Sequence, residues 1–367
     1  MPVACGAMAA PLRLVFLGSD PIALPLLDWL AGEGGTLAEV VAVYTQPDRP
    51  AGRGQKVEPG PIKLWAASHR VPVRQPEKLM AEERAWLAEQ PADLALVMAY
   101  GQILKEDFIA TPRLGTLNLH ASLLPRYRGA SPIQTAIAGG DPETGVTLMR
   151  VVRKLDAGPV AEEARVPIGP LDTALDVEQK LAAACVPLLA RTLPRLRAGT
   201  LEFSAQNDQA ATYCRRLVKE DGRLDFAAPA AVLAARVNGL FPWPGCGAEI
   251  NGVAVRFGLA DALPGPVGEP GRVIGADAAG LLVTTSAGTL RVRRLQRPGG
   301  KMLSAVEFLR GFPVPAGTVL PSQAMAPLVA ARHFTGGTPV PLQTHGRDAR
   351  ATPDTGEMLG PPRSRTM

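Results

Sequence analysis

An amide, an imidazole and a carboxylate are the side chains in this 367-residue sequence best suited to catalysis. Asn118 and His120 stand two positions apart in an apolar stretch, so on a strand both side chains would leave the same face. An amide can donate to a developing oxyanion and an imidazole can move a proton, a combination that suits acyl transfer. On spacing alone, the favoured interpretation is a buried Asn–His pair that the backbone satisfies.

The carboxylate is Asp156, which lies in the segment Lys154–Gly158 just after an expected strand at residues 146–152. From a strand end it could reach a neighbouring loop and orient His120. Alone, an aspartate in such a segment is more often a turn former.

Two basic segments could contact a nucleic acid. The loop at residues 45–56 combines cations with Pro and Gly, and suits either phosphate contacts or a solvated surface. The stretch 291–297 could line one basic face of a strand, or serve as an ordinary solubilising edge strand. The cations concerned are Arg49, Arg53, Lys56, Arg291, Arg293 and Arg294.

Charge and composition limit the classes of function. The formal charge is −2 over residues 12–209 and +5 over residues 210–320, which fits either a polyanionic partner or a solvated surface in an Arg-rich protein. Four scattered cysteines without Cys/His metal spacing argue against a structural zinc site and favour a reduced, cytoplasmic setting. No run of 18 uncharged apolar residues occurs, so we expect no membrane span.

The elements that must position these residues alternate along the first half of the chain. Strands are expected at 12–17, 39–44, 94–99, 114–119 and 145–151, and helices at 22–30, 62–68, 79–89 and 172–197. This alternation predicts a parallel, doubly wound sheet. The turn at residues 18–21 lacks the GxGxxG pattern, so the dinucleotide fingerprint is absent.

The second half of the chain has a different sequence pattern. Short β-like runs separated by Gly/Pro turns predict a small antiparallel barrel. We therefore expect a disordered leader at 1–11, a catalytic domain at 12–201, a linker at 202–220, a barrel domain at 221–320 and a disordered tail at 321–367.

Taken together, several motifs resemble the methionyl-tRNA formyltransferase family over about residues 12–320. Asn-x-His, Ser-Leu-Leu-Pro and Leu-Asp-x-Gly are shared with other folate-dependent formyltransferases and hydrolases. Three features narrow the resemblance: the loop TQPDRPAGRG at 45–54, the stretch RYRGASPIQ at 126–134, and FPWPG at 241–245. The turn at 18–22 departs from the family's usual GTPxF.

The resemblance implies an α/β, Rossmann-like formyltransferase domain followed by a small OB-like β-barrel domain. It implies that Asn118, His120 and Asp156 form the catalytic trio. It assigns folate contacts to Ser122, Leu123, Leu124, Pro125, Tyr100 and Gly101. The substrates it implies are 10-formyltetrahydrofolate and initiator methionyl-tRNA, with the tRNA meeting the six cations named above. We expect no metal and a monomer.

Two other functions stay open. The same chemistry could serve a small acceptor, such as glycinamide ribonucleotide, an amino sugar nucleotide or water. The chain could also bind nucleic acid with an inactive core. The basic loop argues against the first alternative, and the intact Asn118, His120 and Asp156 argue against the second.

Overall fold

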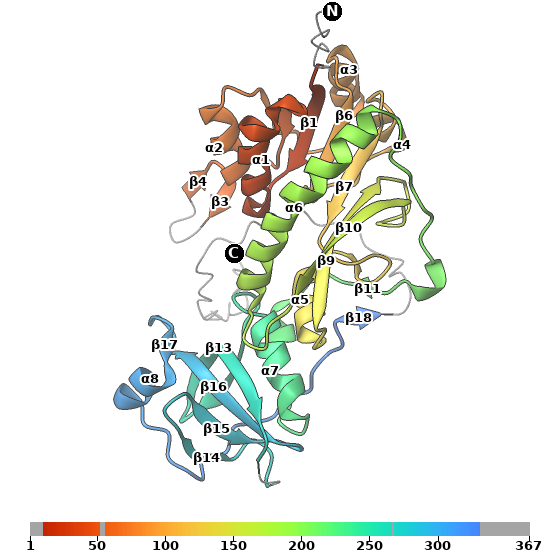
Figure 1. The fold of residues 1–367 in the computed structure, drawn as a ribbon. Helices are drawn as coiled ribbons and strands as arrows, with labels where there is room; N and C mark the ends of the chain where they lie inside the picture. Colours follow the sequence, from red (N-terminus) through yellow and green to blue (C-terminus); the bar gives the residue numbers. More distant parts are fainter. Residues whose placement is uncertain (1–9, 52–55, 266–267, 331–367) are drawn as a thin grey trace, which may run out of the picture.

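The computed structural model describes residues 10–51, 56–265 and 268–330. In this part of the chain, Figure 1 shows an α/β region that begins with β1 and a smaller region built around β13 and β16. Each region has its own cluster of buried apolar side chains. Residues 198–229 run from the first region to the second.

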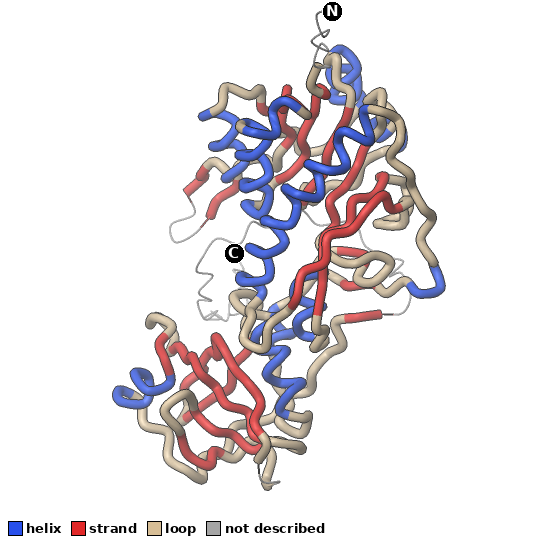
Figure 2. Tube along the Cα trace, in the orientation of Figure 1, coloured by secondary structure: helices blue, strands red, loops and turns tan. Residues whose placement is uncertain are grey.

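A seven-stranded mixed sheet forms the centre of the α/β region (Figure 2). Alternate residues of β1 point to opposite faces, so Leu14 and Phe16 join one core while Val15 and Leu17 join another. Both faces are therefore covered, as in a doubly wound sheet. In sheet order the strands are β10 (Val160–Pro167), β9 (Glu143–Arg150), β7 (Thr116–His120), β6 (Leu94–Met98), β1 (Leu12–Gly18), β2 (Ala38–Tyr44) and β5 (Val73–Arg74).

Among the described residues, four helices cover one face of this sheet and two cover the other. The first group is α1 (Leu24–Ala31), α2 (Pro61–Ser68), α5 (Pro132–Ala138) and α6 (Ala174–Arg197). The second group is α3 (Ala81–Glu89) and α4 (Glu106–Ile109). The long helix α6 begins after Thr173, whose backbone N–H and hydroxyl both donate to Asp176 Oδ2, at 2.9 and 2.6 Å.

The expectation of a parallel sheet is wrong for β9, and β10 is a further strand that the sequence analysis did not predict. β1, β2, β5, β6 and β7 pair in parallel, but β9 runs antiparallel to β7, and β10 antiparallel to β9. Residues 151–159 alone join β9 to β10, which is too short for the crossover that a parallel pair requires.

The segment expected as a loop at residues 45–56 also contains regular structure. Two short strands, β3 (Arg49–Ala51) and β4 (Lys56–Glu58), pair antiparallel. Pro50 and the charged neighbours of these strands give no alternating apolar pattern, so the sequence does not reveal the pair.

The smaller region is a curled antiparallel sheet, a half-barrel, with α7 (Ala230–Gly239) packed against it. Its apolar core includes Phe257, Val283 and Leu290 from three of its strands. The strands are β12 (Cys246–Ile250), β13 (Val253–Leu263), β16 (Thr289–Gln296), β15 (Leu281–Thr284) and β14 (Val273–Ala276), and β17 (Leu303–Ser304) pairs with β16. Helix α8 (Ala305–Gly311) follows β17.

The prediction of disorder from residue 321 is wrong for residues 321–330. Met325 and Leu328 pack on the core of the half-barrel, and β18 (Val329–Ala330) pairs with β11 (Tyr213–Cys214). A few apolar anchors and backbone hydrogen bonds order this segment, and neither produces a periodic pattern. The prediction for residues 331–367, like that for residues 1–9, lies outside the described residues.

Candidate active site

Strand β7 carries the first two members of the expected trio. His120 is its last residue and is 6% exposed, and Asn118 is half-buried two positions earlier. His120 Nε2 lies 2.9 Å from the carbonyl oxygen of Tyr127. A carbonyl only accepts, so Nε2 must carry the proton of that bond and Nδ1 remains available. Within the described residues, the Asn118 side chain makes no hydrogen bond.

Asp156 comes to His120 by a route that the sequence did not indicate. Because β9 runs antiparallel to β7, its end at Arg150 lies opposite Leu117, away from His120. The loop at residues 151–159 folds back, and Asp156 adopts a left-handed backbone with φ +47. Its Oδ2 then lies 3.8 Å from His120 Nδ1. This distance gives electrostatic contact without a direct hydrogen bond.

Two further bonds fix the aspartate. The backbone N–H of Gly129 donates to Asp156 Oδ2 at 2.8 Å. The Gln206 amide donates to the carbonyl oxygens of Asp156 and Gly158, at 2.9 and 2.7 Å. Hydrogen bonds therefore hold Asp156 at both its carboxylate and its backbone, which suits a group that must face one atom of His120.

The expected folate segment is a turn after β7. Thr147 on β9 holds it, accepting from Leu124 N at 3.1 Å and donating to the Ser122 carbonyl at 2.6 Å. The Ser122 hydroxyl donates to Arg126 O within the turn and is fully buried. Leu123 and Pro125 are half-buried, so apolar surface is the part of this turn left for a ligand.

Tyr100 and Gly101 follow β6 at the same edge of the sheet. The Tyr100 side chain is buried in the core, where burial raises the pKa of its phenol well above the usual range. Its carbonyl oxygen accepts from Ser19 Oγ at 3.4 Å and from Gln46 Nε2 at 3.0 Å. These bonds join the ends of β1, β2 and β6, and Gly101, with φ +81, continues the chain from there. The Tyr100 ring is thus part of the scaffold.

The expected tRNA-binding cations are spread over two regions. Arg49 on β3 is exposed and lies 3.4 Å from Glu77. Lys56 begins β4, and Arg53 lies outside the described residues.

On β16 the arginines differ in their partners. Arg291 and Arg293 both bind the Asp261 carboxylate, at 2.6 and 2.8 Å, and Arg291 also binds Asp277 at 3.0 Å. Burial opposes ionisation of Asp261, but these arginine hydrogen bonds outweigh it and lower the pKa of its carboxyl group to about 2. Arg294 is exposed. Most of the local positive charge is therefore neutralised within the sheet.

Sequence reasoning assigned no role to Arg128, which lies next to the site. Its side chain is 0% exposed, and its guanidinium donates to Gln206 Oε1 at 2.7 Å and to the Tyr213 hydroxyl at 3.2 Å. It also forms an ion pair with Asp208 at 2.8 Å. Gln206 in turn binds the backbone of Asp156, so the buried Arg128 stabilises the position of Asp156 through Gln206. The RYRG stretch at 126–129 was the signal that could have pointed to it.

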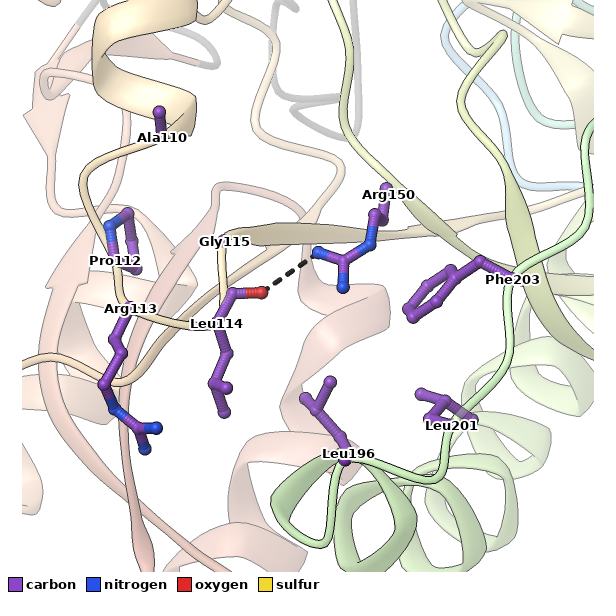
Figure 3. A pocket seen from close by; sticks show the side chains of 10 residues that line it. Ala110, Pro112, Arg113, Leu114, Gly115, Arg150, Leu196, Leu201 and Phe203 are labelled. Atoms are coloured by element: carbon purple, nitrogen blue, oxygen red, sulfur yellow. Dashed lines mark hydrogen bonds between the residues drawn. The ribbon is translucent and has the colours of Figure 1, made fainter.

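A cavity of about 430 Å³ lies elsewhere on the sheet (Figure 3). It is lined by Leu114 and Gly115, before β7, and by Arg150, whose Nη1 donates to Leu114 O at 3.1 Å. The Arg150 guanidinium lies 4.2 Å from the centre of the Phe203 ring. Residues at the start of β7 line this cavity, so it is remote from His120 at the strand's end.

A second cavity, of about 270 Å³, borders the turn after β1. It is lined by Pro21, Ile22 and Ala182 among others, and by Glu178 of α6. Burial raises the pKa of Glu178 to about 7, and the negative charge of Asp20 adds to this effect. This pocket lies at the same end of β1 as Ser19, on the face of the sheet that α6 covers.

Among the described residues, no cluster of three or more His, Cys, Asp or Glu side chains could hold a metal ion. Nor does that part of the chain contain a helix with the length and apolar character needed to cross a membrane.

Comparison with known proteins agrees with this architecture. Residues 12–193 match the formyl transferase family model, and residues 216–313 match the model for the formyl transferase C-terminal domain. The methionyl-tRNA formyltransferase of Pseudomonas fluorescens strain SBW25 is 46% identical over 298 residues, covering 81% of this chain and 93% of the relative. That of Aromatoleum aromaticum is 43% identical over 310 residues, covering 84% and 97%.

Solved structures share the fold at low sequence identity. The N-formyltransferase of Helicobacter canadensis, in complex with folinic acid and dTDP-3-aminofucose, has a TM-score of 0.58 at 18% identity, covering 78% of this chain and 99% of that one. HypX of Aquifex aeolicus, in complex with tetrahydrofolic acid, has a TM-score of 0.57 at 16% identity, covering 83% and 48%.

The mixed sheet, the polar side chains at the end of β7 and the appended half-barrel define an enzyme of the formyl-transferring class. With relatives this similar over most of both chains, the chain belongs to the methionyl-tRNA formyltransferase family.

Proposed function

We propose that this protein transfers the formyl group of 10-formyltetrahydrofolate to the α-amine of initiator methionyl-tRNA, which supplies formylmethionyl-tRNA for translation initiation. The observation that carries the proposal is the meeting of His120 and Asp156, 3.8 Å apart, at the end of the strand that also bears Asn118. It occurs in a chain 46% identical to a methionyl-tRNA formyltransferase.

In the proposed reaction, the α-amine nitrogen attacks the formyl carbon and the carbonyl oxygen becomes an oxyanion. The Asn118 amide, which makes no hydrogen bond among the described residues, donates to that oxygen; a donor of this kind contributes about 3–4 kcal/mol of barrier lowering. The bond from the formyl carbon to N10 of the folate then breaks. The proton lost by the amine ends on N10.

His120 assists this proton transfer through Nδ1, the ring nitrogen that the Tyr127 carbonyl leaves available. Asp156 orients the ring and stabilises the positive charge that it gains. Alignment of an amine with an already reactive formyl donor supplies much of the remaining rate, since proximity alone can contribute about 7–11 kcal/mol.

The folate donor is consumed as a substrate, and the residues present suit it. The half-buried Leu123 and Pro125 offer apolar surface to a flat ring, and Gly101 brings a backbone without a side chain to the same edge of the sheet. On the tRNA side, Arg49 and Arg294 are the exposed members among the predicted cations whose side chains are described, and exposed cations can meet phosphates.

The test is formyl transfer from labelled 10-formyltetrahydrofolate to charged initiator tRNA, charged elongator methionyl-tRNA and small amines such as an amino sugar nucleotide. We expect turnover with the initiator tRNA and at least about a hundredfold lower kcat/KM with small amines. Comparable turnover with a small amine would favour the alternative acceptor, and tRNA binding without transfer would favour the inactive-core alternative.

We also propose that the protein acts in the cytoplasm as a monomer. Charged tRNA and reduced folate meet there, and Cys185, Cys214 and Cys246 are free and buried. Analytical ultracentrifugation at working concentration tests the monomeric state, and a concentration-dependent dimer would contradict it.

A further inference from the structure

The chain returns from the half-barrel to the α/β region through residues 321–330, which we call the C-terminal strap. At its start, Ser322 Oγ accepts from Phe226 N at 2.9 Å, and Gln323 N donates to Leu224 O at 2.8 Å. Further along, Met325 and Leu328 pack on the half-barrel core, and Leu328 is buried. Figure 1 shows the strap ending as β18 beside β11.

Carbonyl groups of the strap complete the hydrogen bonding of two arginines. The buried Arg236 donates to Asp221 O at 2.9 Å and to Ala326 O at 3.1 Å. Arg215 binds the Asp221 carboxylate and reaches Pro327 O at 3.4 Å. Without the strap, the Arg236 guanidinium would lose the Ala326 carbonyl as an acceptor, and an unsatisfied charged donor is costly. The strap is therefore an integrated part of the fold.

From its end, the strap connects to the candidate site through two strand pairings. β18 pairs with β11, placing Val329 opposite Cys214. β11 in turn pairs in parallel with β8 (Arg128–Gly129), placing Cys214 opposite Gly129. The three strands form one small sheet, with β11 in the middle.

The strand β8 is where this sheet meets the trio. Gly129 N donates to Asp156 Oδ2, and the carbonyl of Tyr127, just before β8, accepts from His120 Nε2. Ala130 N donates to Cys214 O at 3.1 Å, so β11 holds the chain on both sides of Gly129. Two-residue strands are weak alone, and removing β18 would leave β11 as an edge strand.

We propose that the C-terminal strap positions the catalytic groups: it fixes β11, β11 fixes β8, and β8 sets the orientation of His120 and the placement of Asp156. The inference rests on the proposed function. It assigns Leu328 and β18 a role in turnover although neither touches a substrate. They are positioning residues.

The experiment compares the full chain with a form ending at Ala330, a form ending at Leu320 and the variant Leu328→Ala. The form ending at Ala330 is the matched control and should keep the kcat of the full chain. The form ending at Leu320 should lose about tenfold or more in kcat, with KM for the folate donor changed less than about threefold. Leu328→Ala should fall between them and Leu328→Met should restore turnover, while Leu303→Ala, the same change at an exposed site, should have no effect.

Hydrogen exchange of the amides in residues 127–130 and 212–214 gives a readout that does not depend on activity. Faster exchange there in the form ending at Leu320, with the exchange of β1 and β6 unchanged, is the expected result. Unchanged kcat in that form, or a lower melting temperature in Leu328→Ala without loss of kcat, would overturn the proposal. A full chain that binds its substrates but transfers no formyl group would instead contradict the proposed function. In that case, faster exchange at residues 127–130 and 212–214 in the form ending at Leu320 would still show that the strap stabilises β11 and β8.

Discussion

The backbone N–H of Gly129 donates a hydrogen bond to Asp156 Oδ2 at 2.8 Å, and that same oxygen faces His120 Nδ1 at 3.8 Å. The glycine belongs to β8 and the aspartate to the loop at residues 151–159, 27 positions apart in the sequence. One carboxylate oxygen thus joins the backbone after β7 to the imidazole at the end of β7. The arrangement makes the placement of Asp156 dependent on main-chain geometry at Gly129, and several predictions can be made from it.

Gly129→Ala should destabilise the protein and lower turnover strongly. With φ +115, this position is strained for any side chain, and an added Cβ would collide with the Cys214 carbonyl oxygen. Gly140→Ala is the matched control, because φ is +75 there but the space is open. It should cost only backbone strain, about 1–2 kcal/mol, and leave kcat unchanged. Thermal unfolding and kcat measure both variants, and equal effects would show that contact with β11 is unimportant.

Asn118→Ala should lower kcat by about 100- to 1000-fold, because the oxyanion would lose a preorganised donor. Folate binding, measured by fluorescence or calorimetry, should change little. Gln296→Ala removes an amide from the half-barrel, where it binds Gly300 O, and serves as the control with normal kcat. If Asn118→Ala retained near-normal turnover, the residue would have to leave the trio.

Asp156→Asn keeps an oxygen that can accept from Gly129 N but removes the negative charge beside His120. We expect kcat to fall by about tenfold or more, because the ring loses electrostatic support. If Asp156 acts through His120, the double variant with His120→Ala should be no slower than His120→Ala alone. Additive losses would instead assign Asp156 a direct role with the substrate, and kcat of the four proteins decides between them.

Glu178→Gln should make stability less sensitive to pH. The pKa of Glu178 is raised to about 7 in the folded state, so the folded protein holds this proton more tightly than the unfolded chain. That contribution is complete at pH below the ordinary glutamate pKa and is lost as pH rises through about 7. Melting temperatures at pH 5 and pH 8 should therefore show the variant gaining a few degrees at pH 8. The same change at the exposed Glu82 is the control. A rise in the melting temperature of Glu178→Gln at pH 5 alone would contradict the predicted direction of the pH effect.

Arg294→Ala should weaken tRNA binding. It should also reduce the slope of the logarithm of the binding constant against the logarithm of the salt concentration by about one. Arg294 is exposed, whereas Arg291 is paired with Asp261 and Asp277. Arg291→Ala should therefore mainly lower the melting temperature of the protein. Filter binding over a range of salt concentrations measures tRNA affinity and its salt dependence for both variants. A larger change in salt dependence for Arg291→Ala would indicate that Arg291, and not Arg294, contacts the tRNA.

Local pattern was enough to predict much of this fold. The apolar runs ending at Leu17, Tyr44 and Leu119 correspond to β1, β2 and β7, and the short β-like runs of the second half correspond to the strands of the half-barrel. The direction of β9 was not predictable in this way, because a strand's apolar residues do not encode whether it runs parallel or antiparallel to its neighbours. The order of residues 321–330 was missed for a similar reason, since it depends on acceptors for Arg215 and Arg236.

The site was predictable only in part. Asn118 and His120 could be paired from their spacing, and the structure also brings Asp156 to His120. The reason offered, a strand end, was wrong, since a left-handed turn in the loop at 151–159 places the carboxylate. Gln206 could not be found from local sequence, because its importance comes from a contact with Arg128, 78 positions away.

The small sheet of β8, β11 and β18 has a topological consequence. The chain leaves the α/β region soon after β11, builds the whole half-barrel, and comes back at β18, the strand next to its point of departure. The half-barrel is thus attached to the α/β region in two ways, covalently through residues 198–229 and by the hydrogen bonds between β18 and β11. Two attachments restrict swivelling about either of them, so the distance between labels on the two regions should have a narrow distribution even before tRNA binds.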